Sequence, residues 1–239
     1  MPFEKEFIVV QSECDLNNNM TMGAILRRAQ QISTDHCAAH GILPETYAAT
    51  HTAFLLAKVS VLLKRPIRVY ERLRIATKTT DAYHAVYRRL TTLHTAEGES
   101  VAEIEAHWVL VDTLTRHILR EAPPQLSFDF SEEVKQRHKM RLPLNIETEV
   151  WGRVTAAYSQ TDMNRHFNNA AYADCICDAM PPAEMAATPL THLLLHYHRE
   201  LPYGETMTLR RGSCPGGGYY FCGDGDNGLV FEAFCSGGQ

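Results

Sequence analysis

Residues 161–172 read TDMNRHFNNAAY and contain the side chains best suited to chemistry. Asp162, Asn164 and His166 stand at every second position, which in an extended segment directs all three side chains to one side. Such a set offers a carboxylate, an amide and an imidazole to a single substrate. A simpler interpretation stays open, in which Asp and Asn only shape a turn and His166 is one of twelve histidines placed there by chance.

Three more polar residues extend this candidate site. Asn168 and Asn169 stand just before a helical pattern, where they could cap the helix and leave backbone N–H groups free for an oxyanion. Glu200, in HYHREL, ends an apolar strand pattern. A carboxylate near a histidine can activate water. A salt bridge between Glu200 and a neighbouring arginine is an equally good alternative.

Other chemistries have less support in the sequence. His192, His196 and His198 share one predicted strand, but a straight strand cannot easily surround a tetrahedral zinc ion. There is no G-x-S-x-G nucleophile motif, no phosphate-binding P-loop and no G-x-G-x-x-G motif after a strand. Cys175 and Cys177 fall within a predicted helix and are expected to be packing residues. We therefore expect neither a metal nor another cofactor.

An earlier segment, CDLNNNMTMGAI, repeats the TDMNRHFNNAAY pattern at a constant offset. Asp162 minus Asp15 gives 147, and the serines three residues before each of these aspartates have the same separation. Asn19 stands where the later segment has His166. A constant offset over several positions indicates a duplicated unit, with the histidine chemistry present only in the second copy.

Length and composition agree with two such units in one chain. The 239 residues carry a net charge of −5, which argues against a general nucleic-acid binder. The amino-terminal residues lack the apolar stretch of a signal peptide, and no apolar run approaches the ~18 residues of a membrane span. Seven irregularly spaced cysteines fit reduced thiols better than a disulfide framework. We expect a cytoplasmic protein that does not associate with a membrane.

The predicted elements also occur twice in the same order. Residues 20–40 have the pattern of an amphipathic helix that stops before Gly41, and four strand patterns follow up to residue 113. The second half contains a strand at 148–159, a helix at 168–180 and four more strands, with Asn227-Gly228 as a hairpin turn. We predict an N-terminal unit at 1–125, a linker at 126–145 and a C-terminal unit at 146–239. The pattern fits an α+β fold in which each antiparallel sheet wraps around one long helix, as in a tandem hotdog.

Over nearly its whole length the chain resembles the acyl-acyl carrier protein (acyl-ACP) thioesterases, which terminate fatty-acid synthesis in plants and many bacteria. The most specific parts are TDMNRHFNNAAY, similar to the family signature Asp-x-Asn-x-His-x-Asn-Asn-x-x-Tyr, and YHRE, similar to a later Tyr-Arg-Arg-Glu. Leu201 stands where many plant members have cysteine, which rules out a required thiol there. His198 replaces the first arginine of the family motif, so a carrier-protein contact at that position is in question.

The resemblance implies a double hotdog that hydrolyses fatty acyl-ACP thioesters, with acyl carrier protein as partner. The catalytic set would be Asp162, Asn164, His166 and Glu200 of the second unit, while the first unit shapes the acyl pocket. Glu200 and His166 would activate water, and Asn164 or backbone N–H groups would bind the oxyanion. Asp162 would orient the other groups or attack the carbonyl itself. An acyl-CoA thioesterase and a non-catalytic acyl-binding protein are the alternatives, and the sheet edges offer a surface for homodimer formation.

Overall fold

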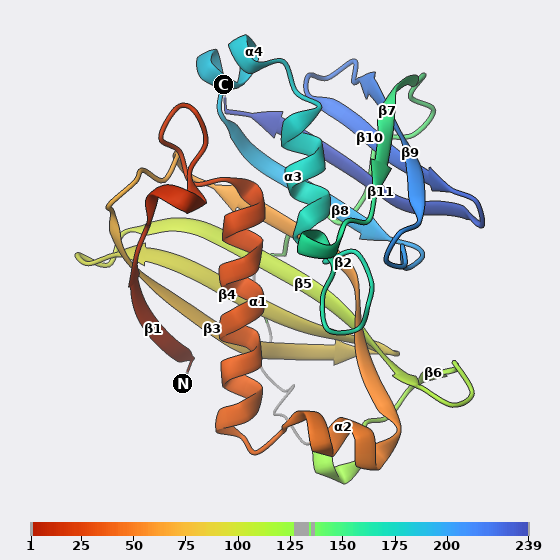
Figure 1. The fold of residues 1–239 in the computed structure, drawn as a ribbon. Coiled ribbons are helices and arrows are strands. Elements are labelled where there is room, and N and C mark those ends of the chain that lie inside the picture. The colour runs from red at the N-terminus through yellow and green to blue at the C-terminus, as the bar shows by residue number, and fades with distance from the viewer. Residues whose placement is uncertain (1, 127–133, 135–136, 239) are drawn as a thin grey trace.

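The computed structural model describes residues 2–126, 134 and 137–238, which fold into two similar units (Figure 1). The first unit contains, in chain order, β1 (Phe3–Ile8), α1 (Met22–Ala39), α2 (Pro44–Thr50), β2 (Thr52–Leu63), β3 (Arg72–Tyr83), β4 (Val86–Thr95), β5 (Ser100–Asp112) and β6 (Ile118–Leu119). The second contains β7 (Glu149–Thr155), α3 (Ala171–Asp178), α4 (Pro182–Ala187), β8 (Leu190–Tyr197), β9 (Thr206–Ser213), β10 (Tyr219–Gly225) and β11 (Gly228–Gly237). None of the described helices is long and apolar enough to cross a membrane.

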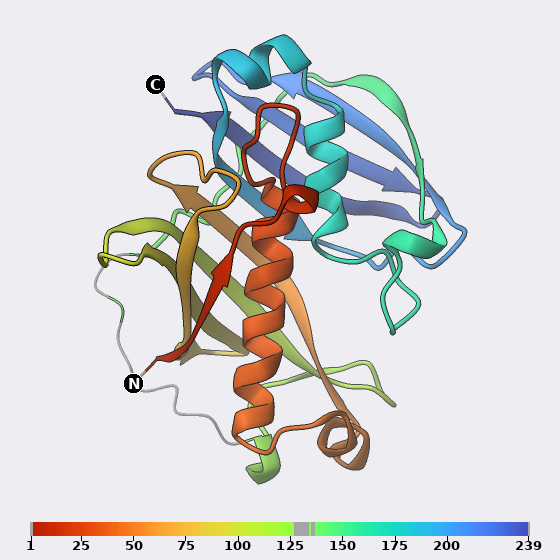
Figure 2. The ribbon, with the colours of Figure 1, turned by 60° about the vertical axis from the view of Figure 1, so that its left-hand side comes forward.

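All described strands belong to one antiparallel sheet that runs through both units. Its order is β1-β3-β4-β5-β2-β8-β11-β10-β9-β7, and β6 pairs with β5. The two units join where β2 pairs with β8, with Ser60 opposite Leu194 at the middle of the shared ladder. Both long helices lie on the same side of this sheet (Figure 2). The hydrogen bonds of the β2–β8 ladder therefore fix the position of one unit against the other.

Helix α1 forms because its apolar residues recur at helical spacing and its first turn is capped. The Thr21 hydroxyl accepts the Ala24 N–H at 3.1 Å, which satisfies one of the backbone donors that a helix start leaves unpaired. Ile25 and Ile32 are almost fully buried against the sheet. Burial of each such side chain contributes about 1.5–3 kcal/mol. The helix ends where Gly41 takes a left-handed φ of 73°.

Helix α3 is the shorter counterpart of α1 and ends before Pro181 and Pro182, as the sequence predicts. Its Tyr172 ring packs against Phe167, Tyr197 and Phe231, with ring centroids 4.8, 5.5 and 4.9 Å away. This aromatic group is the centre of the second unit's core.

The duplication is visible where the two helices meet. Arg27 of α1 and Asp174 of α3, which are 147 positions apart, form an ion pair across the junction. Gly23 allows this close approach, since a Cβ atom at that position would collide with the Asp174 carboxylate. Equivalent points of the two units therefore face one another, as expected for two copies related by an approximate twofold axis.

These observations confirm the predicted tandem hotdog, in which an antiparallel sheet wraps a helix in each unit. The Asn227-Gly228 hairpin between β10 and β11 is confirmed, and Gly228 takes the positive φ that the turn requires. Helices α2 and α4 were not predicted, because each begins at a proline that the sequence indicates as a connection or a stop. Proline is also well suited to the first turn of a helix.

The predicted linker at 126–145 lies partly outside the described residues, which exclude 127–133 and 135–136. The described part crosses the outer face of the sheet. His138 donates its backbone N–H to the Glu105 carboxylate at 2.9 Å, and its Nδ1 lies 2.9 Å from the Ser60 hydroxyl. The division into 1–125, 126–145 and 146–239 stays a prediction.

Candidate active site

Residues 162–166 form a closed turn and not the extended segment that the alternating pattern suggests. The Asp162 N–H donates to the His166 carbonyl at 2.9 Å, and Arg165 takes a positive φ of 65°. The Asp162 carboxylate accepts the Asn164 N–H at 2.8 Å. The expectation of an extended segment was wrong, because the aspartate shapes a local turn with its own backbone.

The first unit contains the same turn. The Asp15 carboxylate accepts the N–H groups of Asn17 and Asn19 at 2.8 and 2.9 Å, and Asn18 has a φ of 61°. Asn19 is 5% exposed. The turn is thus common to both copies, whereas the imidazole belongs only to the second.

The structure brings His166 and Glu200 together, although 34 positions separate them. Their Nε2 and Oε2 atoms are 3.4 Å apart, and the two side chains are 33% and 47% exposed. The backbone holds this contact, since Phe167 N–H donates to the Leu201 carbonyl at 2.8 Å. Strand β8 ends at Tyr197, so Glu200 lies in the turn beyond the strand and not on it. A half-exposed pair of this kind is accessible to both water and substrate.

Asn168 and Asn169 lie between this pair and α3, but neither is the N-cap residue. The helix starts at Ala171, its N-cap is Ala170, and no side chain caps it. The Asn168 side chain instead accepts the Ala170 N–H at 2.9 Å. Asn168 therefore forms a turn before the helix and does not cap it. As a result, α3 starts two residues later than the position equivalent to the start of α1.

Two amide groups near the pair are available to a ligand. Within the described part of the chain, the Asn169 N–H has no hydrogen-bond acceptor, and its carbonyl accepts the Tyr197 hydroxyl at 2.8 Å. The Asn164 side chain is exposed and likewise has no partner among the described residues. Tyr197 was missed in the sequence, although it is the first residue of YHRE; its contact anchors the loop that carries Asn169.

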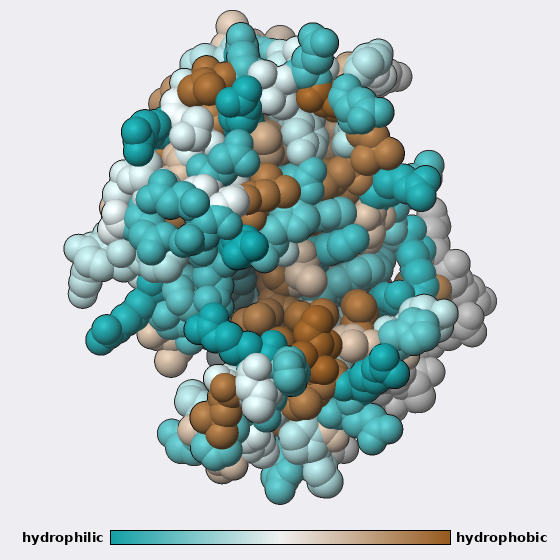
Figure 3. Space-filling model, turned by 90° about the vertical axis from the view of Figure 1, so that its right-hand side faces the viewer, coloured by the Kyte–Doolittle hydropathy of each residue, from teal (hydrophilic) through white to brown (hydrophobic). Residues whose placement is uncertain are grey.

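An apolar cavity extends from this loop into the first unit. A narrow space, partly open to solvent, lies between α1 and the inner face of β2, β4 and β5. Leu26 and Ala29 line it from the helix, Ile104 from the sheet, and Asn169 and Ala170 from the loop. Figure 3 shows a hollow with an apolar floor on one side of the molecule. His166 and Glu200 do not line the cavity but stand next to its loop wall.

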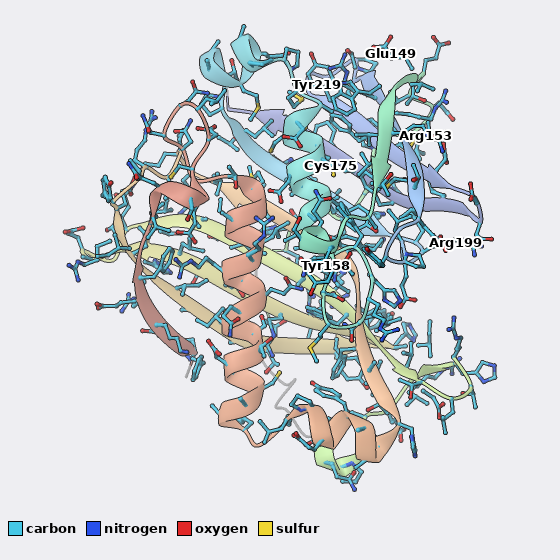
Figure 4. The ribbon with its side chains drawn as sticks, in the orientation of Figure 1. Glu149, Arg153, Tyr158, Cys175, Arg199 and Tyr219 are labelled. Carbon is cyan, nitrogen blue, oxygen red and sulfur yellow. The ribbon has the colours of Figure 1, made fainter. Side chains whose placement is uncertain are left out.

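Two arginines near the pair are free of described acidic partners. Arg165 is exposed in the turn, and Arg199 precedes Glu200; neither forms an ion pair with any residue the structure describes. Figure 4 shows Arg199 beyond the end of β8 and Tyr158 on the loop after β7. His198, by contrast, is 2.7 Å from the Glu232 carboxylate. Arg165 and Arg199 are therefore exposed cations in the same loops as the carboxylates of Asp162 and Glu200.

The thiols of α3 are not suited to nucleophilic attack. Cys175 is buried, and burial raises the pKa values of Cys175 and Cys177 to about 12. Both thiols are therefore protonated near neutral pH. Within the described ranges, no group of three His, Cys, Asp or Glu side chains is arranged to hold a metal ion.

The chain thus combines a tandem hotdog with an imidazole–carboxylate pair beside an apolar cavity. Two family profiles match this chain: the acyl-ACP thioesterase N-terminal domain at residues 1–125 and the acyl-ACP thioesterase C-terminal domain at residues 144–213. The chain belongs to the acyl-ACP thioesterase family.

Among curated relatives, the chain is 22% identical over 219 residues to a chloroplastic palmitoyl-acyl carrier protein thioesterase of Gossypium hirsutum. It is 21% identical over 229 residues to a chloroplastic oleoyl-acyl carrier protein thioesterase of Coriandrum sativum. The matches cover 83% and 87% of this chain but only 52% and 61% of the relatives. The chain thus spans a little over half the length of the curated relatives it matches.

Solved structures show the same fold over the full chain. A Lactobacillus plantarum protein assigned as an oleoyl thioesterase superimposes with a TM-score of 0.88 at 22% identity, covering 98% of this chain and 94% of that one. The 12:0-ACP thioesterase from Umbellularia californica gives 0.81 at 15% identity, covering 98% and 96%. These similarities establish the double hotdog architecture.

Proposed function

We propose that this protein hydrolyses fatty acyl-ACP thioesters and releases a free fatty acid and holo-ACP. The observation that carries the proposal is the 3.4 Å contact between His166 Nε2 and Glu200 Oε2 beside the loop wall of an apolar cavity. Membership of the acyl-ACP thioesterase family supports the substrate class. The cavity supplies the apolar surface that an acyl chain needs, and the polar pair supplies the chemistry at its end.

The pair can act as the base for water. The Glu200 carboxylate, with His166 beside it, takes a proton from a water molecule, whose oxygen then attacks the thioester carbonyl. The tetrahedral intermediate collapses with cleavage of the C–S bond. The thiolate of the phosphopantetheine arm leaves. It then takes up the proton that was removed from water, and His166, beside Glu200, can deliver this proton. A thiolate is a good leaving group, so strong acid assistance is unnecessary.

The developing oxyanion needs hydrogen-bond donors at the same place. The Asn169 N–H supports this role, because it has no acceptor among the described residues and its residue lines the cavity. The Asn164 amide is the other candidate, and its exposed position suits a substrate that arrives from solvent. Asn168 would support both donors by holding the turn before α3.

Asp162 is assigned an orienting role in this scheme. Its carboxylate accepts a backbone N–H, and Asp15 accepts the equivalent N–H in the first unit, where Asn19 stands in place of His166. A function shared with a turn that lacks this histidine is structural, and this favours direct attack by water over an anhydride at Asp162. The first unit is accordingly proposed to shape the acyl pocket without catalysis.

The proposed partner is acyl carrier protein. Arg165 and Arg199 flank the pair and could contact an anionic carrier near the thioester, whereas His198 is engaged by Glu232. Homodimer formation, a cytoplasmic location and the absence of membrane association stay predictions from the sequence. Gel filtration with light scattering and cell fractionation would check them.

The proposal is tested by measuring thiol release from matched acyl-ACP and acyl-CoA substrates with the purified protein. Release of free thiol, with acyl-ACP turned over faster than acyl-CoA, is the expected result. Faster turnover of acyl-CoA would favour the acyl-CoA thioesterase alternative. Stable binding of acyl-ACP without thiol release would overturn the hydrolase assignment and favour a non-catalytic acyl-binding protein.

A further inference from the structure

A tryptophan in the wall of the cavity carries a polar group that the described residues do not satisfy. Trp108 of β5 lines the cavity, and its indole Nε1–H is buried without an acceptor among the described residues. The indole N–H is only a donor, so no rearrangement of the ring lets it act as an acceptor instead. A buried donor without an acceptor is costly, and native structures rarely contain one without a reason.

Three hydroxyl groups in the cavity wall differ from Trp108, because each has a hydrogen-bond partner. The Ser33 hydroxyl donates to the Ala29 carbonyl at 2.7 Å, and the Thr91 hydroxyl is 2.9 Å from that of Thr77. The Tyr197 hydroxyl donates to the Asn169 carbonyl. Away from the Asn169 N–H, which is assigned to the oxyanion, the indole is thus an unsatisfied donor among hydroxyl groups that have partners.

A second polar group stands in the same wall. Arg89 of β4 lines the cavity and is 7% exposed. Its guanidinium is 2.8 Å from His36 Nδ1, which lies on α1. Burial and the nearby arginine lower the pKa of His36 to about 4, so the imidazole is neutral and accepts this hydrogen bond. Helix and sheet are thus connected across the cavity by a buried polar contact, in a place where a plain alkyl chain would need only apolar neighbours.

We propose that this cavity selects acyl chains that carry an oxygen substituent, a hydroxyl or oxo group, which accepts the Trp108 Nε1–H. This inference rests on the proposed function, because it specifies the acyl group of the thioester to be hydrolysed. A saturated alkyl chain offers no acceptor and would leave the donor unsatisfied. An oxygen at the depth of Trp108 accepts the indole N–H. This hydrogen bond replaces the one that the oxygen loses when it leaves water.

The register of the sheet places the donor close to the reaction end of the cavity. Trp108 pairs with Leu56 of β2 on one side and with Tyr87 of β4 on the other. Leu56 is also a cavity residue, and so is Tyr197, three residues before Glu200. An oxygen on the part of the chain that passes between these residues would lie beside the Trp108 ring.

The first arm of the test compares hydrolysis of decanoyl-ACP with that of a set of hydroxydecanoyl-ACP thioesters that carry the hydroxyl at successive carbons. We expect one position to be preferred over the plain chain by about three- to tenfold in kcat/KM, the range that one hydrogen bond supplies. Trp108→Phe keeps an aromatic ring but removes the donor, and should reduce that ratio to about one or below. Trp151→Phe, on β7, is the matched control and should leave the ratio unchanged.

The second arm measures binding without chemistry. In the Trp151→Phe protein Trp108 is the sole remaining tryptophan, since the chain has two. Titration with decanoic acid and with the hydroxydecanoic acids should shift its emission, with tighter binding of the preferred hydroxy acid. This binding readout does not depend on turnover, so a protein that binds but does not hydrolyse would contradict the proposed function while supporting the inference. Equal binding of plain and hydroxylated acids, or a ratio unaffected by Trp108→Phe, would overturn the inference.

Discussion

Replacement of Glu200 by glutamine tests the proposed base directly. Glutamine keeps the size of the side chain but cannot take a proton from water. A general base contributes about 100- to 10,000-fold to a rate. The Glu200–His166 pair is 47% and 33% exposed and its contact is 3.4 Å, so bulk water can partly replace the base. We therefore expect a loss at the lower end, about 100- to 1,000-fold in kcat, which corresponds to about 2.7–4 kcal/mol of barrier.

The same exposure predicts almost no loss of stability. A solvent-exposed ion pair contributes about 0–1 kcal/mol, so the melting temperature of Glu200→Gln should fall by at most a few degrees. The assay combines thiol release from acyl-ACP at saturating substrate with a thermal melt followed by circular dichroism. Glu205→Gln is the matched control, because this exposed glutamate lies five residues further along the same loop. It should have a near-normal rate.

Substitutions at His166 and Glu200 are expected to have non-additive effects on the rate. If His166 and Glu200 act as one unit, the double variant His166→Ala, Glu200→Gln should be little slower than either single variant. Strictly multiplicative losses would refute the idea of a shared step. A Glu200→Gln enzyme within about fivefold of the parent, with an unchanged melt, would remove Glu200 from the mechanism.

Three further predictions concern positions around the site. Asn19→Ala, at the place of His166 in the first copy, should retain near-normal hydrolysis, which a rate assay checks; a large loss with intact folding would contradict a structural first unit. Tyr197→Phe leaves the Asn169 carbonyl without its donor and should cost about 1–3 kcal/mol in a urea titration and several-fold in kcat. His36 is neutral in the fold, so its contribution to stability is present above its unfolded pKa of 6.5 and is lost as pH falls toward about 4. The urea midpoint should therefore drop between about pH 7 and pH 5, and His36→Gln should reduce this drop; an unchanged drop would exclude His36 as its source.

The fold could be predicted from the sequence because the strongest sequence patterns are local. Residues 20–40 combine helical spacing with Thr21 as a cap, and Asn227-Gly228 specifies its hairpin without help from distant residues. The constant offset between the two aspartate turns indicated that the chain contains two similar units. Helices α2 and α4 were missed because proline has more than one meaning in a sequence. Pro44 and Pro182 start these helices, but each proline is also compatible with a loop or with the end of a helix.

The residues of the candidate site could be predicted from the sequence, but their arrangement in space could not. His166 and Glu200 could be named from residue type, while the turn at Asp162 replaces the extended segment expected from alternation. The distance between loop and strand depends on long-range pairing, such as Phe167 with Leu201, that no local pattern encodes. Trp108 in the cavity wall could not be singled out from the sequence, because an unsatisfied N–H is a property of the packed structure.

The repeat also fixes how many substrates one chain can process. Residues 147 positions after Leu26 and Ser33, which line the cavity, are Ala173 and Met180, and both are buried. Beside them the Tyr172 ring packs against Phe167 and Phe231. A pair of identical hotdog subunits would hold two equivalent reaction centres, whereas the site proposed for this fused pair occurs once. Titration with a tight-binding acyl analogue should thus saturate at one equivalent per polypeptide.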